Sequence, residues 1–460
     1  MLCPLWFSFV LVKIRALGLT RYLESFYAVV LLFGLTQGPV LSVFWRSEQA
    51  NAGLSPDVSV YGLFMFLQIP AVVILFSQRQ QLTKRLFPLI ALMSYLMWMF
   101  ASTFWSTLRS QTFVASSSLI MTAFTGLYFA SRFTIREQVL RIAVAMQIGL
   151  LASWWAVHRN WPGVETSREQ WKQDCTPATG ENGDMCKIRF VGNWIGIYFN
   201  KNSLAPVATV GVLSLLALIW WEARDRSKPW WKARVAILAD VVLLNFLVLK
   251  KTGSATTLVA ALVAVGVWIG WSLLRRIVRS RQEISETVRQ AIFSVFAATL
   301  ALGVWLFAKY ESSFASLLGK SSGFDGRTNY WSVSWDAFIE RPIIGWGWLA
   351  AWFSPEFRST LPESLTNDFF SHSAYLEVLM GGGVIAGLMF LGFLLWAGEH
   401  STRAFLEREG GQWLVCISVF VLVSATQESF LSGNHFFFAL LIAGLTSGLI
   451  GEETLTPTSS

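Results

Sequence analysis

His372 is the residue of this 460-residue sequence best suited to act as a general base. It ends a long polar segment and opens the apolar run HSAYLEVLMGGGVIAG, in which Glu377 follows about one helical turn later. A histidine that faces an aqueous vestibule at a membrane surface can accept a proton near neutral pH. We therefore predict His372 as the catalytic residue, with Ser373 and Glu377 as supporting residues. The structural alternative is a histidine that only caps a helix at the interface.

Two arginines are candidates for binding phosphate. Arg189 precedes FVGNWIGIYFNKNSLA in one long polar segment, and Arg327 lies in GFDGRTNYWSVSWDAFIERPIIGWGW in another. A guanidinium group matches phosphate oxygens with two parallel hydrogen bonds and stays charged at any working pH. If both segments converge on one pocket, the two arginines form a diphosphate clamp, with Lys201 as a third donor and Asn202 as a supporting group. A lone loop arginine is otherwise a solvated charge or a contact to a lipid headgroup.

The elements that must position these residues are apolar helices. The chain is 54% hydrophobic and 14% charged, against roughly 25% charged in an average soluble domain, and its mean hydropathy is +0.51. Apolar runs occur near 23–45, 58–77, 86–107, 112–131, 137–157, 203–221, 234–249, 256–274, 290–308, 374–397, 412–427 and 434–450. Each is long enough, or nearly so, to cross about 30 Å of hydrocarbon as a helix. The sequence therefore predicts an all-α polytopic integral membrane protein with about twelve transmembrane helices.

The distribution of basic residues predicts the topology. Twenty Lys and Arg lie in the short loops on one side of the predicted membrane and four in those on the other, which places both termini in the cytoplasm. The predicted parts are 1–157 with helices 1–5, the first exported loop 158–202, 203–308 with helices 6–9, the large exported loop 309–373, and 374–460 with helices 10–12 and a cytoplasmic tail. The net charge of +8 thus indicates membrane topology, not a nucleic-acid partner. The apolar first dozen residues lack a basic leader and a cleavage site, and we expect an interfacial or short buried helix there.

Cysteine usage agrees with an exported first loop. Cys175 and Cys186 flank the polar stretch TPATGENGDM, and a disulfide between them suits an oxidising compartment. Two free thiols are the alternative. No histidine or second cysteine pair lies nearby at the spacing of a zinc site, so we expect no metal there.

Glycine and tryptophan residues near the candidate site have structural interpretations. Gly381, Gly382 and Gly383 lie in a row inside a predicted span, where they allow close packing of helices or close approach of a lipid chain. The second exported loop is rich in aromatic residues, and we expect an interfacial belt rather than stacking on sugars. They are Tyr330, Trp331, Trp335, Trp346, Trp348 and Trp352.

Taken together, RFVGNWIGIYFNKNSLA, GRTNYWSVSWDAFIERPIIGWG and HSAYLEVLMGGGVIAG resemble the O-antigen ligase and polymerase superfamily of bacterial envelope glycosyltransferases. In that family a His is followed by Asn, Ser or Gln, then after nine residues by Gly, two further residues, and Gly, Thr or Tyr. His372, Ser373 and Gly383 match this spacing. Position 386 is Ala, with Gly387 one place later, so the helix after the site departs slightly from the family's register. The resemblance covers about 185–390.

The resemblance implies a GT-C-like membrane fold and a metal-independent transferase without cofactor. Its donor would be a glycan on undecaprenyl diphosphate, and its acceptor lipid A-core or another terminal glycan. By position, Arg189 and Arg327 would bind the diphosphate, His372 would activate the acceptor hydroxyl, and Lys201 with Asn202 matches the family's Lys-Asn pair. The protein would lie in the bacterial inner membrane with its active site on the periplasmic face.

Three functions stay open at the level of sequence. A ligase transfers a preassembled polysaccharide to a terminal acceptor, and the single large loop before His372 favours this reading. A polymerase of the same superfamily instead extends the lipid-linked chain. A polysaccharide or lipid transporter is the alternative from a different class, but transporters usually place ionisable groups near the bilayer midplane. Here Asp240 is the main charge deep in a predicted span.

Overall fold

The computed structural model describes most of the apolar runs and parts of the two long loops. The described residues are 19–38, 58–77, 89–159, 167–171, 189–198, 200–227, 229–279, 285–309, 327–362, 365, 370–431 and 435–450. The first dozen residues and the predicted disulfide pair, Cys175 and Cys186, lie outside them. The chain forms two compact units, one of residues 1–46 and 137–253 and the other of residues 47–136 and 254–460. Each unit is described by itself.

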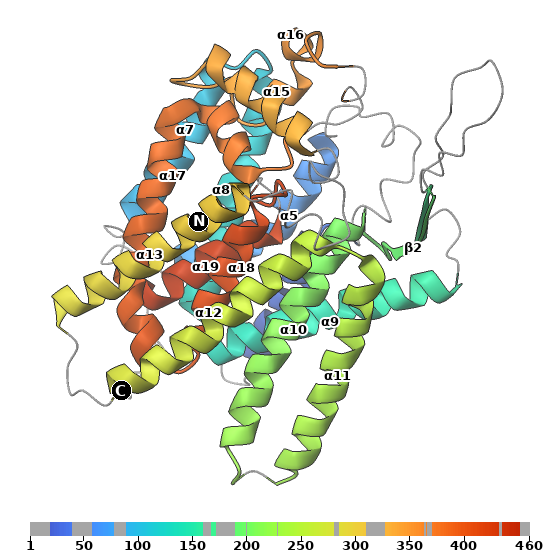
Figure 1. Ribbon diagram of the computed structural model, residues 1–460, viewed down its shortest axis with the longest axis vertical. Coiled ribbons are helices and arrows are strands. Elements are labelled where there is room, and N and C mark those ends of the chain that lie inside the picture. The colour runs from blue at the N-terminus through green and yellow to red at the C-terminus, as the bar shows by residue number, and fades with distance from the viewer. Residues whose placement is uncertain are drawn as a thin grey trace, which may run out of the picture. The chain divides into compact units, whose positions relative to one another are not determined.

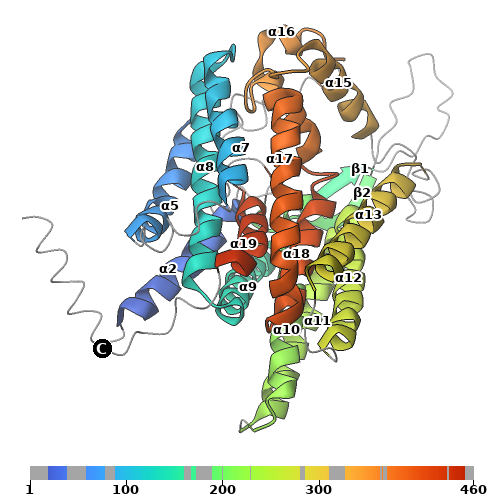
Figure 2. The same ribbon diagram turned by 90° about the vertical axis from the view of Figure 1, so that its left-hand side faces the viewer.

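The described residues of the first unit form four helices and a small sheet (Figure 1). Its elements are α2 (Leu19–Leu35), α9 (Ile135–Arg159), β1 (Ser167–Trp171), β2 (Arg189–Trp194), α10 (Lys201–Arg224) and α11 (Trp231–Thr252). The strands β1 and β2 pair antiparallel, with Trp171 opposite Arg189. Helices α10 and α11 form an antiparallel hairpin and lie side by side (Figures 1 and 2). The sheet is a departure from the predicted all-α fold.

The second unit contains the remaining described helices. They are α5 (Val58–Ser77), α7 (Ile90–Ala101), η2 (Ser102–Phe104), α8 (Arg109–Arg132), α12 (Ala255–Arg279), α13 (Glu286–Lys309), α15 (Arg327–Glu340), η4 (Ala351–Phe353), α16 (Pro355–Arg358), α17 (Ala374–Glu407), α18 (Gly411–Ser424) and α19 (Phe436–Ile450). Helix α17 packs on α7, α19 and α15. The short helices α15 and α16 lie at the end of the unit where α17 begins (Figure 2).

Apolar side chains fill the space between these helices, and many others are exposed on their outer surfaces. Phe66, Val73, Leu262 and Leu388 are each more than 60% exposed, and patches of such residues mark a surface that meets lipid or a partner. Among the described residues, five helices are long and apolar enough to cross a membrane, namely α8, α9, α10, α12 and α17. The protein is therefore a helical membrane protein. The count of twelve spans, the GT-C-like arrangement and the five predicted parts stay predictions.

The described part of the large predicted exported loop, residues 327–362, packs around a core that it shares with Met380 of α17. Trp346 and Trp352 are almost completely buried and pack with Phe338, Phe357 and Met380. The indole Nε1 of Trp346 donates to the carbonyl oxygen of Ala337 in α15 over 2.8 Å. The expected interfacial belt is therefore wrong for these tryptophans and for Trp348, which is 1% exposed. Trp346 and Trp352 belong to the core that holds α15 at the end of the bundle.

The glycine run of α17 is a break in the helix rather than a smooth packing surface. Gly383 has φ +69° and ψ −168°, values open to glycine but costly for other residues. The backbone N–H groups of Trp346 and Gly347 donate to the carbonyl oxygens of Met380 (2.8 Å) and Gly381 (3.0 Å). Beyond the break, the Val384 N–H donates to the carbonyl oxygen of Pro342 over 2.7 Å.

The predicted close packing at the glycines is thus confirmed, but the packing partner is the irregular segment 342–347. An α-helix with a break leaves backbone groups without an intrahelical partner, and this segment supplies the partners. On the other side, the indole Nε1 of Trp98 in α7 donates to the Gly382 carbonyl oxygen over 2.8 Å. The first part of α17, which follows His372, is thereby fixed to α7 and to the segment 342–347.

We expect Gly383→Ala to lower the free energy of unfolding by at least about 1–2 kcal/mol, because its Cβ would need a left-handed backbone and would overlap the Ile343 carbonyl group. Gly392→Ala in the same helix is the matched control, since its Cβ would meet no atom within 4 Å and alanine favours a helix. Thermal unfolding of the detergent-solubilised proteins measures both. Equal melting temperatures for the two variants would contradict the role of the break.

Candidate active site

Arg327 is the first residue of α15, and its side chain contacts two other segments of the second unit. Its Nη1 donates to Thr256 Oγ1 at the start of α12 and to Gln427 Oε1 after α18, each over 3.0 Å. Its Nη2 forms an ion pair with Glu428. The whole residue is only 9% exposed, so Arg327 is a buried group that joins three segments rather than a free side chain in an open vestibule.

Glu428 connects this arginine to the predicted base. One carboxylate oxygen, Oε1, pairs with Arg327, and the other, Oε2, lies 3.5 Å from His372 Nδ1. Both carboxylate and imidazole are mostly buried, with 11% and 19% of their side chains exposed. A carboxylate that faces one ring nitrogen orients the imidazole and favours a proton on that nitrogen. Nε2 is then the nitrogen that can accept a proton from a substrate.

The backbone at His372 is held in a conformation that few residues adopt. Its φ is +52°, in the left-handed region where histidine is uncommon. Ser371 on one side and Ser373 on the other fix this turn, because Ser371 Oγ donates to the Ser373 carbonyl oxygen over 2.8 Å. Tyr330 and Phe370 contact the imidazole ring by edge-to-face packing at 5.0 and 4.8 Å between centroids.

Glu377 is the buried acceptor beneath this turn. Its Oε1 accepts from the Ser371 backbone N–H (2.7 Å) and from Ser429 Oγ (3.1 Å), and it lies 3.0 Å from Ser371 Oγ, whose one proton is shared between this carboxylate and the Ser373 carbonyl oxygen. Ser371 precedes His372 and Ser429 follows Glu428, so one carboxylate ties together the two segments that carry the pair. This geometry suits the supporting role predicted for Glu377.

The other predicted phosphate ligands belong to the first unit. Arg189 is the first residue of β2, and the chain runs from this strand through a tight turn to α10. The Tyr198 hydroxyl in that turn lies 3.3 Å from Thr36 Oγ1, and burial raises the pKa of this tyrosine above its ordinary value. Lys201 begins α10 and Asn202 follows it. The convergence of Arg189 and Lys201 with Arg327 and His372 stays a prediction.

Asn200 has a role beside Lys201 and Asn202 that the sequence reasoning missed. Its Oδ1 accepts from the backbone N–H of Ser203 over 2.9 Å, which makes it the N-cap of α10 and satisfies one of the free donors at the helix start. The helix start fixed by this cap is where Lys201 and Asn202 lie.

Glu428 and Gln427 were also missed by the sequence reasoning. They lie in the polar stretch TQES, residues 426–429, between the apolar helices α18 and α19. A carboxylate at the end of a predicted span is costly unless it is paired, and that is the signal from which they could have been found. The partners of Glu428, which are Arg327 and His372, lie far from it in the sequence.

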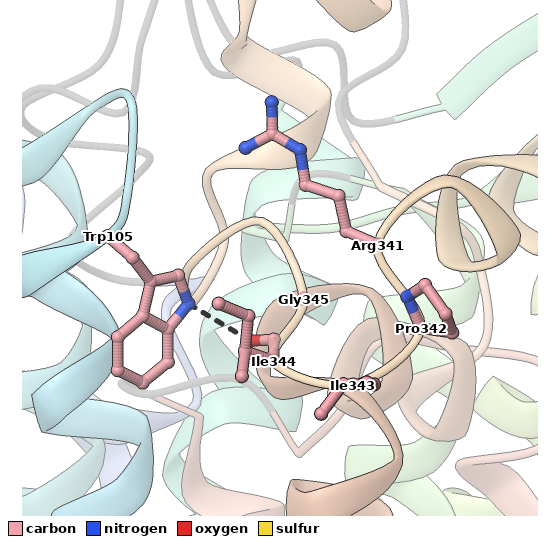
Figure 3. Close-up of a pocket in the computed structure, with 6 residues that line it drawn as sticks. All are labelled: Trp105, Arg341, Pro342, Ile343, Ile344 and Gly345. Carbon is pink, nitrogen blue, oxygen red and sulfur yellow. Dashed lines mark hydrogen bonds between the residues drawn. The ribbon is translucent and has the colours of Figure 1, made fainter.

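A cavity of about 370 Å³ lies in the same unit but away from these residues. It is lined by Trp105 and by Arg341, Pro342, Ile343, Ile344 and Gly345, as Figure 3 shows. The indole Nε1 of Trp105 donates to the Ile344 carbonyl oxygen over 3.0 Å. None of the predicted site residues lines this cavity, so we do not assign it to the site.

Within the described residues, no group of three or more His, Cys, Asp and Glu is arranged to hold a metal ion. The metal-independent mechanism and the lack of a cofactor stay predictions, to be tested with chelator.

The fold and the paired polar residues define a helical membrane protein with an arginine, a carboxylate and a histidine in contact at the ends of its helices. Residues 241–391 match a family model described as O-Antigen ligase. This match covers about a third of the chain, includes Arg327, His372 and Gly383, and confirms the resemblance to the O-antigen ligase superfamily. The members are glycosyltransferase-like enzymes of the ligase and polymerase type. No curated protein matches the chain.

Proposed function

We propose that the protein is a membrane glycosyltransferase of the O-antigen ligase type. It transfers a preassembled glycan from an undecaprenyl-diphosphate carrier to lipid A-core or another terminal acceptor. The reaction takes place on the periplasmic face of the bacterial inner membrane, with both termini in the cytoplasm. The observation that carries the proposal is the contact series from Arg327 through Glu428 to His372, within and beside the segment that matches the family.

The proposed reaction is a single displacement. His372 Nε2 removes the proton of an acceptor hydroxyl group, and the hydroxyl oxygen forms a bond to the anomeric carbon of the donor. The bond from that carbon to the diphosphate oxygen breaks, and its electron pair leaves with the lipid diphosphate. The product therefore has the inverted anomeric configuration. The imidazolium that forms lies beside Glu428 Oε2, and a carboxylate in that place stabilises it.

Arg327 has donors left for the departing phosphate. A guanidinium has five N–H groups, and among the described residues three of them are engaged, by Thr256, Gln427 and Glu428. The remaining two can hydrogen-bond phosphate oxygens, and preorganised donors of this kind stabilise developing charge strongly when water is excluded. Arg189 and Lys201 would supply the other half of the clamp.

The test is reconstitution of the full chain in liposomes with a lipid-diphosphate-linked glycan and a core acceptor. We expect transfer to the acceptor with unchanged rate in the presence of chelator. His372→Ala should lower the rate about 10²–10⁴-fold, the usual contribution of a general base. The matched control is His400→Ala, since His400 Nδ1 also faces a carboxylate, Glu399 Oε2 at 2.7 Å, but lies at the other end of α17.

Each alternative has its own outcome in the same assay. A ladder of lipid-linked products without transfer to the core acceptor would indicate a polymerase. Transport of the lipid-linked glycan that His372→Ala leaves intact, with no glycosidic product, would indicate a transporter. Loss of transfer on addition of chelator would contradict the metal-independent mechanism, and equal rates for the two histidine variants would remove His372 from the site.

A further inference from the structure

The hairpin of α10 and α11 carries a carboxylate, Asp240, near the middle of its length. Helix α10 is among the described helices that can cross a bilayer, and α11 packs antiparallel along it (Figure 1). Asp240 is about 14 Å along the axis from Trp231 at one end of α11 and about 18 Å from Thr252 at the other, at 1.5 Å per residue. Lys232 and Lys251 lie near the two ends of the helix. Helix α11 is not itself among the described helices that can cross a bilayer by length and composition. A depth near the centre of a hydrocarbon layer about 30 Å thick follows for Asp240 from the packing of α11 along α10 and is part of the inference below.

Asp240 lies on the side of α11 that faces away from the hairpin. The stripe Ile237, Asp240, Leu244 and Leu247 follows one face of the helix, and we call it the outer face of α11. All four residues are exposed, Ile237 by 62% and Leu244 and Leu247 by 50% each. The opposite face, with Asn245, Val248 and Leu249, is buried. Asp240 is not needed for packing within the hairpin.

Within the part of the chain that the structure describes, Asp240 makes no ion pair or hydrogen bond. A lone carboxylate at the centre of a lipid bilayer is unfavourable by several kcal/mol, and ionisable residues in spans therefore pair with one another or with polar groups. The surrounding side chains of the outer face are aliphatic and supply no donor. The missing group must come from whatever covers this face.

We propose that the outer face of α11 binds a transmembrane helix of another membrane protein that carries a lysine or arginine at mid-depth. Aliphatic residues on both sides of Asp240 match the apolar surface of such a helix, and the carboxylate matches its one positive charge. A second copy of this chain fits less well, because two parallel α11 helices related by a twofold axis would bring like charges to the same depth. The proposal concerns a different surface from the candidate active site and does not depend on the proposed function.

The test uses the full-length protein, labelled at its C-terminus, in lipid vesicles with synthetic single-span peptides. One peptide is a leucine-rich helix with a central lysine, and the other has leucine at that position. Energy transfer from the protein to labelled peptide measures association. We expect the lysine peptide to bind about tenfold more tightly than the leucine peptide, in the range of polar contacts between membrane helices.

Three variants make the result specific to the carboxylate. Asp240→Leu should reduce the preference for lysine to less than twofold, and Asp240→Glu should keep it. Leu247→Ala, on the same face, should leave the preference unchanged. Because the outer face does not pack within the hairpin, all three variants should elute from gel filtration as the wild-type protein does, which separates loss of binding from loss of folding.

Several results would overturn the proposal. They are an equal affinity of the wild-type protein for both peptides, or a lysine preference that survives Asp240→Leu. Energy transfer between two copies of the protein that Asp240→Leu abolishes would assign the outer face to a homodimer. Fast labelling of Asp240→Cys by a membrane-impermeant thiol reagent, absent in the wild-type protein, would place position 240 in water. A cross-link from that cysteine within a single chain would show that the chain itself covers the face.

Discussion

Glu428→Gln should reduce kcat for glycan transfer by about 10²–10⁴-fold, although Glu428 touches neither the donor nor the acceptor in the proposed mechanism. Glutamine keeps the size of the side chain but removes the negative charge that faces His372 Nδ1 and Arg327 Nη2. Loss of the orienting carboxylate lowers the rate of serine proteases by about 10⁴-fold, because the imidazole then has the wrong tautomer and its cation is less stable. The same physics applies to a histidine that deprotonates a sugar hydroxyl.

If Glu428 acts by positioning His372, Glu428→Gln should change other kinetic quantities besides kcat. KM for the donor should change less than kcat, and the pH profile of kcat should shift, because the charge next to the titrating imidazole is gone. Glu356→Gln is the matched control, since Glu356 pairs with Arg341 at 2.9 Å with 60% of its side chain exposed. Steady-state transfer rates across pH measure both. If Glu428→Gln keeps more than half of the wild-type kcat with an unchanged pH profile, Glu428 has no part in catalysis.

Arg327→Ala should cost about 3–5 kcal/mol of unfolding free energy in addition to activity. Removal of one partner of a buried ion pair leaves the other charge buried and uncompensated, and Glu428 is 8% exposed. The double variant Arg327→Met with Glu428→Leu should recover most of this stability, because apolar residues can replace a buried pair at little cost. It should not recover transfer. Stability and activity are therefore separable at this pair.

The free energy of unfolding is measured by chemical denaturation of the single and double variants in detergent. The transfer rates of the same proteins are measured in parallel. Arg403→Ala is the control for loss of an ion pair as such, because Arg403 and Glu407 are exposed neighbours on α17 and pairs of this kind contribute about 0.3–0.5 kcal/mol. An Arg327→Ala protein as stable as the wild type would mean that water reaches Glu428. A double variant with normal transfer would exclude both residues from the mechanism.

The helices could be predicted from the sequence because their signal is local. A run of about 20 apolar residues needs no knowledge of its neighbours to be read as a helix in a membrane. Each of the twelve predicted runs overlaps a described helix, the first of them only as far as Leu35, and five of these helices are long and apolar enough to span. His372 and Arg327 could also be selected from local signals, since the chain has only four histidines and Arg327 lies in one of its two long polar segments. The family spacing around His372 and Gly383 added a second local signal.

The contacts of the site could not be predicted, because they join segments distant in the chain. Glu428 pairs with a residue 101 positions earlier, and nothing in TQES indicates which arginine it meets. Burial of Arg327 was missed for the same reason, as an arginine in a polar loop reads as solvated until its partners are known. The loop tryptophans were assigned to a belt because composition does not show that a loop of this length packs around a core.

During synthesis, residues 342–347 leave the ribosome before α17 does. The carbonyl groups of Met380 and Gly381 accept their hydrogen bonds from this earlier segment, and in hydrocarbon each backbone group without a partner costs several kcal/mol. The broken first part of α17 can therefore reach its final place only after the segment before it has folded around Trp346. The chain supplies these two parts in the required order, so insertion of α17 is coupled to the direction of translation.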